Sequence, residues 1–137
     1  SETLLKELGQ SNGMIGLSLY PHHLSNGTNC TLESFCEMVA RTADIMGAEH
    51  IGIGSDLCLN QPDSVVDWMR KGTWTKTIDY GEGSKDNAAF PKQPAWFKNA
   101  TGFNNIENGL KSIGFNTDET NGILGNNWFN FYKNYIG

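Results

Sequence analysis

One carboxylate and two histidines stand where the sequence predicts the ends of buried strands. Asp56 follows directly on the run Ile51-Gly52-Ile53-Gly54-Ser55, and His22-His23 follow an apolar run that closes at Pro21. The carboxyl ends of parallel strands form the edge at which α/β proteins bind ligands. A carboxylate there could hold an ammonium group, orient a metal-bound water or ligate a cation, or it could cap the next turn.

The histidines carry a less specific signal than the aspartate. Rings adjacent in sequence rarely reach one ion, and zinc needs a third or fourth ligand from other strands. We therefore favour a surface-loop role for His22 and His23 over a metal role. His50 precedes a predicted strand at its amino end, the edge associated with stability, so we interpret it as structural.

Aromatic residues offer a second kind of site. Tyr20 ends the first predicted strand and could line the same edge, although core packing explains it equally well. Trp68, Trp74 and Trp96 lie within residues 57–101, which lack periodicity and are interpreted as a long loop or insertion. Their rings could form a hydrophobic wall or a sugar-stacking platform, or they could merely anchor the loop.

The elements that would position these residues form a strand–helix–strand unit. Residues 14–20 are interpreted as a strand buried on both faces, and residues 51–56 as a second strand. Between them, Thr31 is a plausible N-cap for a helix whose apolar residues recur at three- and four-residue steps until Gly47. This order predicts parallel strands with a right-handed crossover. Further helices are expected over 1–10, 104–113, 117–124 and 126–135.

Composition narrows the class of protein. The net charge of −5 argues against a nucleic-acid partner, and 38% hydrophobic residues suffice for the core of one domain. Cys30, Cys36 and Cys58 lack the spacing of a zinc site or a disulfide framework and are interpreted as small apolar residues. The sequence shows no signal-peptide pattern and no apolar run approaching about 18 residues, and it does not indicate a compartment.

Four segments, taken in order, resemble the carboxyl-terminal part of the membrane (renal) dipeptidase family. The specific pair is the run from Glu49 to Asp56 together with the tail Ile123-Leu124-Gly125-Asn126-Asn127-Trp128, since either alone would be weak. The runs 13–21 and 44–47 complete the resemblance. It spans the chain except for about residues 61–101 and covers roughly the last third of the family's length. The 137 residues are too few for a complete eight-stranded barrel, which takes about 250.

The resemblance implies a zinc metallopeptidase on an α/β barrel, with two zinc ions whose ligands lie upstream of this segment. No metal ligand is therefore assigned here. Asp56 matches the family's aspartate at the end of the last barrel strand, and Tyr20 matches an aromatic position that lines the substrate pocket. The resemblance implies that this aspartate meets the bridging water or the free amino group of the dipeptide, so Asp56 would be catalytic and substrate-binding. The family often continues this aspartate motif with Phe-Asp-Gly, whereas Leu57-Cys58-Leu59 follow here, and His22-His23 has no counterpart in the pattern.

We therefore expect residues 1–137 to form one segment, the carboxyl-terminal part of a (β/α)8 barrel with its last two parallel strands. The complete protein would hydrolyse dipeptides, whereas the isolated segment would be inactive. Exposed strand edges would require the missing amino-terminal part of the barrel or self-association, including a homodimer. Two alternatives stay open: a non-catalytic module that binds peptides or sugars through the tryptophan-bearing loop, and an inactive barrel homologue kept for assembly.

Overall fold

The computed structural model describes residues 1–62, 64–65, 68 and 90–136 and shows an α/β fold built on two parallel strands. Strand β1 (Ile15–Ser18) pairs with β2 (Ile51–Gly54), and Ser18 lies opposite Gly54. Helix α2 (Leu32–Met46) connects them. The predicted parallel pair is confirmed, but both strands are shorter than predicted. Tyr20 already caps the 3-10 turn Pro21–His23, and Asp56 has a left-handed φ of 50°, which an extended strand does not accommodate.

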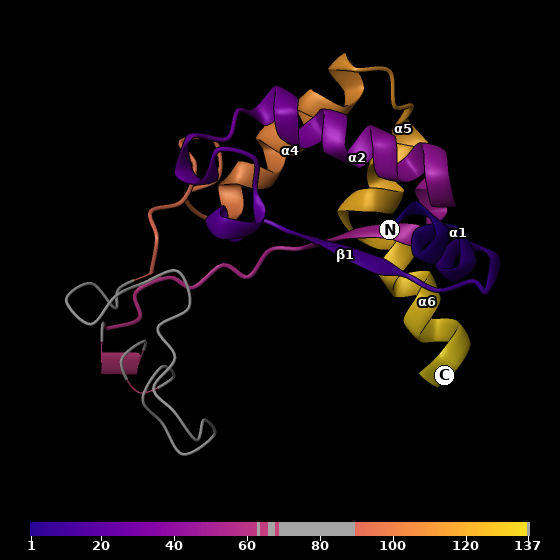
Figure 1. The fold of residues 1–137 in the computed structure, drawn as a ribbon, viewed down its shortest axis with the longest axis horizontal. Coiled ribbons are helices and arrows are strands. Elements are labelled where there is room, and N and C mark those ends of the chain that lie inside the picture. The colour runs from indigo at the N-terminus through magenta and orange to yellow at the C-terminus, as the bar shows by residue number, and fades with distance from the viewer. Residues whose placement is uncertain (63, 66–67, 69–89, 137) are drawn as a thin grey trace.

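Helices cover both faces of this strand pair (Figure 1). Helices α2, α4 (Phe103–Ser112) and α5 (Thr117–Asn121) lie on one side of the strands, and α6 (Asn127–Ile136) lies on the other. Helix α1 (Glu2–Gln10) opens the chain. Further short turns of 3-10 helix span Gly27–Asn29, Ala48–His50 and Ala100–Gly102, and a π turn spans Gly122–Asn126. None of the described helices is long and apolar enough to cross a membrane.

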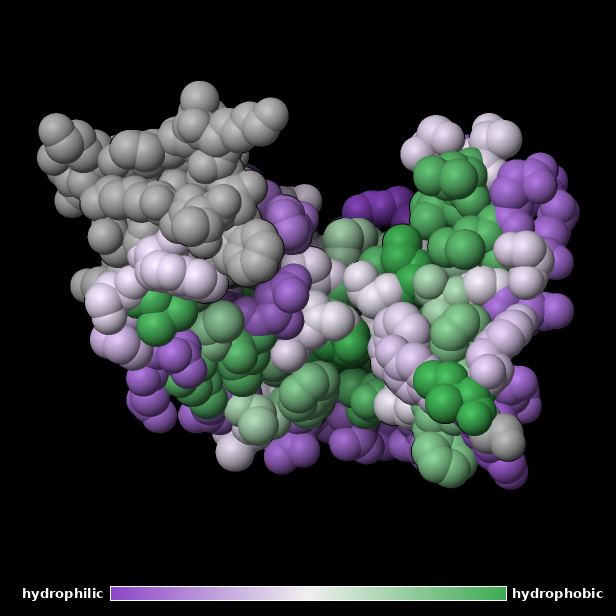
Figure 2. Space-filling view, turned by 90° about the horizontal axis from the view of Figure 1, so that it is seen from below, coloured by the Kyte–Doolittle hydropathy of each residue, from purple (hydrophilic) through white to green (hydrophobic). Residues whose placement is uncertain are grey.

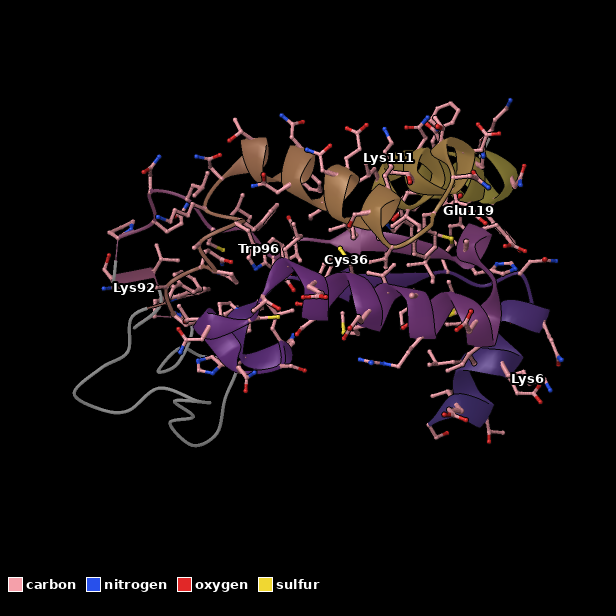
Figure 3. The ribbon with its side chains drawn as sticks, turned by 90° about the horizontal axis from the view of Figure 1, so that it is seen from above. Lys6, Cys36, Lys92, Trp96, Lys111 and Glu119 are labelled. Atoms are coloured by element: carbon pink, nitrogen blue, oxygen red, sulfur yellow. The ribbon has the colours of Figure 1, made fainter. Side chains whose placement is uncertain are left out.

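Helix α2 begins and ends where the sequence predicts. The Thr31 hydroxyl accepts a hydrogen bond from the Ser34 backbone N–H at 3.1 Å, and Gly47 ends the helix with a φ of 93°. Cys36 is fully buried on the side of α2 that faces α4 (Figure 3). A Cβ placed on Gly109 of α4 would lie only 2.7 Å from the Cys36 Sγ, so the two helices approach closely at this glycine.

Two boundaries in the last third differ from the prediction. We expected a helix over 104–113, but α4 begins at Phe103, directly after a 3-10 turn that Asn99 caps. Asn105 lies inside the first turn of α4, where its amide donates to the Trp96 carbonyl at 2.7 Å. The helix expected over 117–124 ends at Asn121, because the π turn with its distorted Gly125 separates it from α6.

The two faces of the strand pair differ, so the expectation that both faces are apolar and buried is wrong. Leu17 and Ile51 point to one side and belong to the hydrophobic core. The other side carries Gly16, Ser18, Gly52 and Gly54, and Gly16 is exposed. We call these four residues the glycine face.

Trp128 of α6 covers one end of the glycine face. A Cβ on Gly52 would come within 2.7 Å of the Trp128 Cε2, and a Cβ on Gly16 within 3.2 Å of its Cζ2. The absence of side chains at these two positions therefore makes room for the indole ring. Asn127 anchors the start of the same helix, since its Nδ2 donates to the carbonyls of Ala48 and Ile51, each at 2.8 Å.

Helix α6 carries an aromatic cluster. Trp128 stacks on Tyr132 with ring centroids 5.8 Å apart, and Phe131 contacts Trp128 and Tyr135 at 6.1 and 4.7 Å. These contacts show that Trp128, Phe131 and Tyr135 share a side of the helix. Several of its large side chains remain exposed, and apolar surface is visible at this end of the molecule (Figure 2). They are Phe129, Tyr132, Tyr135 and Ile136.

Candidate active site

Asp56 and Ser18 meet at the carboxyl edge of the two strands. Ser18 is the last residue of β1, and Asp56 follows β2 by two residues. The Ser18 hydroxyl donates a hydrogen bond of 2.6 Å to the Asp56 Oδ2. The parallel register explains the contact, because it places the ends of both strands at the same edge. Asp56 is exposed and has the left-handed φ of 50° that aspartate tolerates better than most residues.

The loop after β1 returns to this edge and adds His23. The Ser18 Oγ lies 3.0 Å from the His23 Nδ1 and accepts a hydrogen bond from the Tyr20 backbone N–H at 3.1 Å. The Tyr20 ring packs against both histidines, with centroids 5.4 Å from His22 and 5.3 Å from His23. The structure therefore brings Asp56, Ser18, His23 and Tyr20 together. This group is called the carboxyl-edge cluster below.

Sequence reasoning missed Ser18 and underrated His23. The sequence places Ser18 within an apolar run and does not distinguish the two histidines. The structure separates them, since only His23 reaches Ser18 in the described part of the chain. A signal was available, because Ser18 carries the only polar side chain in the run 14–19. A lone hydroxyl at the ligand-binding end of a parallel strand could have singled it out.

The other predicted candidates lie elsewhere. Trp96 is half-buried, donates from Nε1 to the Cys30 carbonyl at 2.7 Å and packs on Phe35 at 5.3 Å, so it anchors the chain against α2 and offers no open sugar platform (Figure 3). Trp68 is exposed, and Trp74 lies outside the described residues. His50 sits half-buried directly before β2, at the amino end where we expected it.

The described residues do not form a metal centre by themselves. Within residues 1–62, 64–65, 68 and 90–136, no three His, Cys, Asp or Glu side chains gather closely enough to hold an ion. The carboxyl-edge cluster contributes one carboxylate and one imidazole, fewer than the three protein ligands of a catalytic zinc site. Its chemistry is instead that of an exposed anion beside a hydroxyl, an arrangement suited to binding a cationic group such as an ammonium.

The fold and the cluster together define an α/β protein with a polar site at the carboxyl edge of a parallel strand pair. Residues 1–69, just over half of the chain, match the sequence model of the membrane dipeptidases, peptidase family M19. The chain therefore belongs to the membrane dipeptidase family, which confirms the resemblance noted from its motifs. No curated protein sequence matches it.

Two solved structures share the fold. An amidohydrolase from Pseudomonas aeruginosa aligns with 95% of this chain at a TM-score of 0.78 and 21% identity. A protein described as dipeptidase AC, a metallopeptidase of family M19, aligns with 96% of it at a TM-score of 0.66 and 16% identity. The alignments cover only 38% and 31% of those two chains, so this chain spans about a third of their length.

Proposed function

We propose that this chain forms the carboxyl-terminal part of a zinc-dependent dipeptidase and that Asp56 holds the free α-ammonium group of the dipeptide. The observation that carries the proposal is an exposed carboxylate at the ligand-binding edge of a strand pair in a membrane dipeptidase family chain. An ammonium is the group that distinguishes a dipeptide from an internal stretch of a longer peptide. A carboxylate is the side chain that binds it most strongly.

A barrel provides the setting for this site. The strand–helix–strand unit is the repeating element of a (β/α)8 barrel, and two strands are far too few to close one. The half-open glycine face and the exposed aromatic side chains of α6 are surfaces that further strands and helices would cover. We propose that the amino-terminal part of the barrel covers them and that the segment alone is inactive. Self-association, including a homodimer, is the competing arrangement.

We propose zinc because the chain belongs to the membrane dipeptidase family. The described residues do not form a zinc site by themselves. We propose that the ligands lie upstream of this segment. In this proposal, the residues of this chain bind and orient the substrate. Asp56 would accept hydrogen bonds from the ammonium group, and the Tyr20 ring, which packs against His23, would line the pocket.

Replacing Asp56 by Asn in the intact natural protein tests the assignment. The change keeps the shape of the side chain and its capacity to accept from Ser18 but removes the charge. A charge-assisted hydrogen bond contributes about 1.5–3 kcal/mol, so kcat/KM for dipeptides should fall roughly 10- to 150-fold. Asp44→Asn, at an exposed position on α2, is the matched control and should leave turnover unchanged.

Near-wild-type turnover in Asp56→Asn would remove Asp56 from the reaction. Elemental analysis of the same protein tests the metal separately. Zinc at about two ions per chain together with dipeptide hydrolysis supports the proposal. A protein that holds no zinc and hydrolyses no dipeptide would instead be a binding module or an inactive relative.

A further inference from the structure

The hydrogen bonds at the carboxyl-edge cluster determine which nitrogen of His23 carries a proton. Ser18 has a single hydroxyl proton, and it points to the Asp56 carboxylate. The same oxygen accepts from the Tyr20 backbone N–H. Since its proton is already used, Ser18 must also accept from His23, so the ring donates through Nδ1–H. A neutral His23 then has its lone pair on Nε2, with Nδ1–H, Ser18 and Asp56 linked in one direction.

This chain of hydrogen bonds restricts the orientation of the Asp56 carboxylate, which the backbone of the strand does not fix. The carboxylate is exposed and belongs to a residue outside the strand, so only side-chain contacts can hold it still. Within the described residues, its one hydrogen bond is the bond from Ser18 to Oδ2. Ser18 itself is fixed by the backbone of β1, whereas His23 and the Tyr20 N–H fill the acceptor sites of the hydroxyl. The Oδ1 atom remains to accept from a ligand.

We propose that Ser18 and His23 are positioning residues that orient the Asp56 carboxylate for the substrate's ammonium group. The inference rests on the proposed function and deepens it, because it names two residues that tune the affinity for a free amino terminus. Immobilising one side chain on binding costs about 0.5–1.5 kcal/mol. A carboxylate that is already oriented avoids this cost, and losing the orientation should raise KM about 2- to 12-fold.

Two pairs of variants in the intact protein isolate the hydrogen-bonding atoms. Ser18→Thr keeps the hydroxyl and Ser18→Val loses it, although the two side chains have nearly the same shape. His23→Asn keeps an N–H donor close to the ring's Nδ1, and His23→Leu lacks one. His22→Leu is the control, because His22 packs on Tyr20 but makes no hydrogen bond to Ser18.

We expect KM for dipeptides to rise 2- to 12-fold in Ser18→Val and His23→Leu, with kcat unchanged, and to stay near wild type in Ser18→Thr, His23→Asn and His22→Leu. Loss of a remote binding contact raises KM alone, whereas partial unfolding would lower kcat and leave KM unchanged. Equal KM values within the Thr/Val pair and within the Asn/Leu pair would overturn the proposal. So would a decrease confined to kcat.

A measurement that needs no activity tests the hydrogen-bond chain itself. Nitrogen-15 NMR of labelled protein, at a pH where His23 is neutral, should show the Nδ1–H tautomer in the wild type. Ser18→Val should return His23 to the Nε2–H form that predominates in free histidine. A wild-type His23 in the Nε2–H form overturns the inference whatever the activity. Absence of dipeptide hydrolysis with the Nδ1–H form present counts instead against the proposed function.

Discussion

The fit between Gly52 and Trp128 makes a sharp prediction about stability. Gly52 is buried, and a Cβ there would come within 2.7 Å of the Trp128 Cε2, a rigid ring atom. Gly54, two residues along the same strand and on the same face, has only ordinary contacts of 3.6 Å, to the Gly16 backbone. Gly52→Ala and Gly54→Ala therefore add the same methyl group to two neighbouring positions, of which only Gly52 lies against the indole.

The expected magnitudes follow from opposing effects. Adding a methyl group to a packed site costs about 1–3 kcal/mol, because neighbouring groups must shift. Replacing glycine by alanine at a compatible backbone position raises the free energy of unfolding by about 0.4–1 kcal/mol, because alanine restricts the unfolded chain. Gly54→Ala should thus be neutral or slightly stabilising, whereas Gly52→Ala should lower the free energy of unfolding by about 1–2 kcal/mol.

Urea unfolding of both variants, followed by circular dichroism, measures the difference. A Trp128→Ala background supplies the decisive comparison, because without the indole Gly52→Ala should cost nothing further. The two changes would then be strongly non-additive, as expected for residues in contact. Equal midpoints for Gly52→Ala and Gly54→Ala, or simple additivity with Trp128→Ala, would refute the idea that the glycine makes room for the ring.

Two further predictions concern the helices. Burial raises the pKa of the Cys36 thiol from 9.0 to about 11, so the unfolded chain loses this proton first. The free energy of unfolding should therefore be unaffected below pH 9 and fall by about 2–3 kcal/mol as the pH approaches 11. Cys36→Ala should lack this loss in alkaline denaturation curves, and Cys58→Ala, at an exposed position, should retain it. At the start of α5, Asn116 and Glu119 form a reciprocal capping box, so Asn116→Ala should lower stability by about 1 kcal/mol in urea titrations and Asn116→Gly by only a few tenths. Wild-type stability in Asn116→Ala would show that the cap contributes nothing.

The sequence predicted the elements whose signals are local. Thr31 and Gly47 mark the two ends of α2 because a hydroxyl cap and a left-handed glycine act on the residues next to them. The parallel pairing of β1 and β2 followed from the helix between them. Asp56 and Tyr20 could be placed at one edge for the same reason, and the structure puts both beside Ser18.

What the sequence did not reveal depends on contacts between distant residues. The sequence predicts strands buried on both faces because Gly16 and Gly52 belong to apolar runs. In the structure, these glycines make room for Trp128, which comes from a distant part of the chain. Ser18 and Asp56 are 38 residues apart, so no local pattern links them. The π turn at Gly122–Asn126 interrupts a helical pattern whose polar and apolar spacing is otherwise continuous.

The packing of α6 against the strand pair must come late in folding during synthesis. The β1, α2 and β2 unit can pair as soon as Gly54 has been synthesised, because all its internal contacts lie within that stretch. The side-chain amide of Asn127, at the start of α6, donates a hydrogen bond to the Ile51 carbonyl, and the two residues are 76 positions apart in the sequence. During synthesis, which runs from the amino terminus, the Gly52 end of the glycine face is thus left without its indole until α6 emerges. A nascent chain halted before α6 would therefore lack the Trp128 ring that packs against Gly52 in the folded structure.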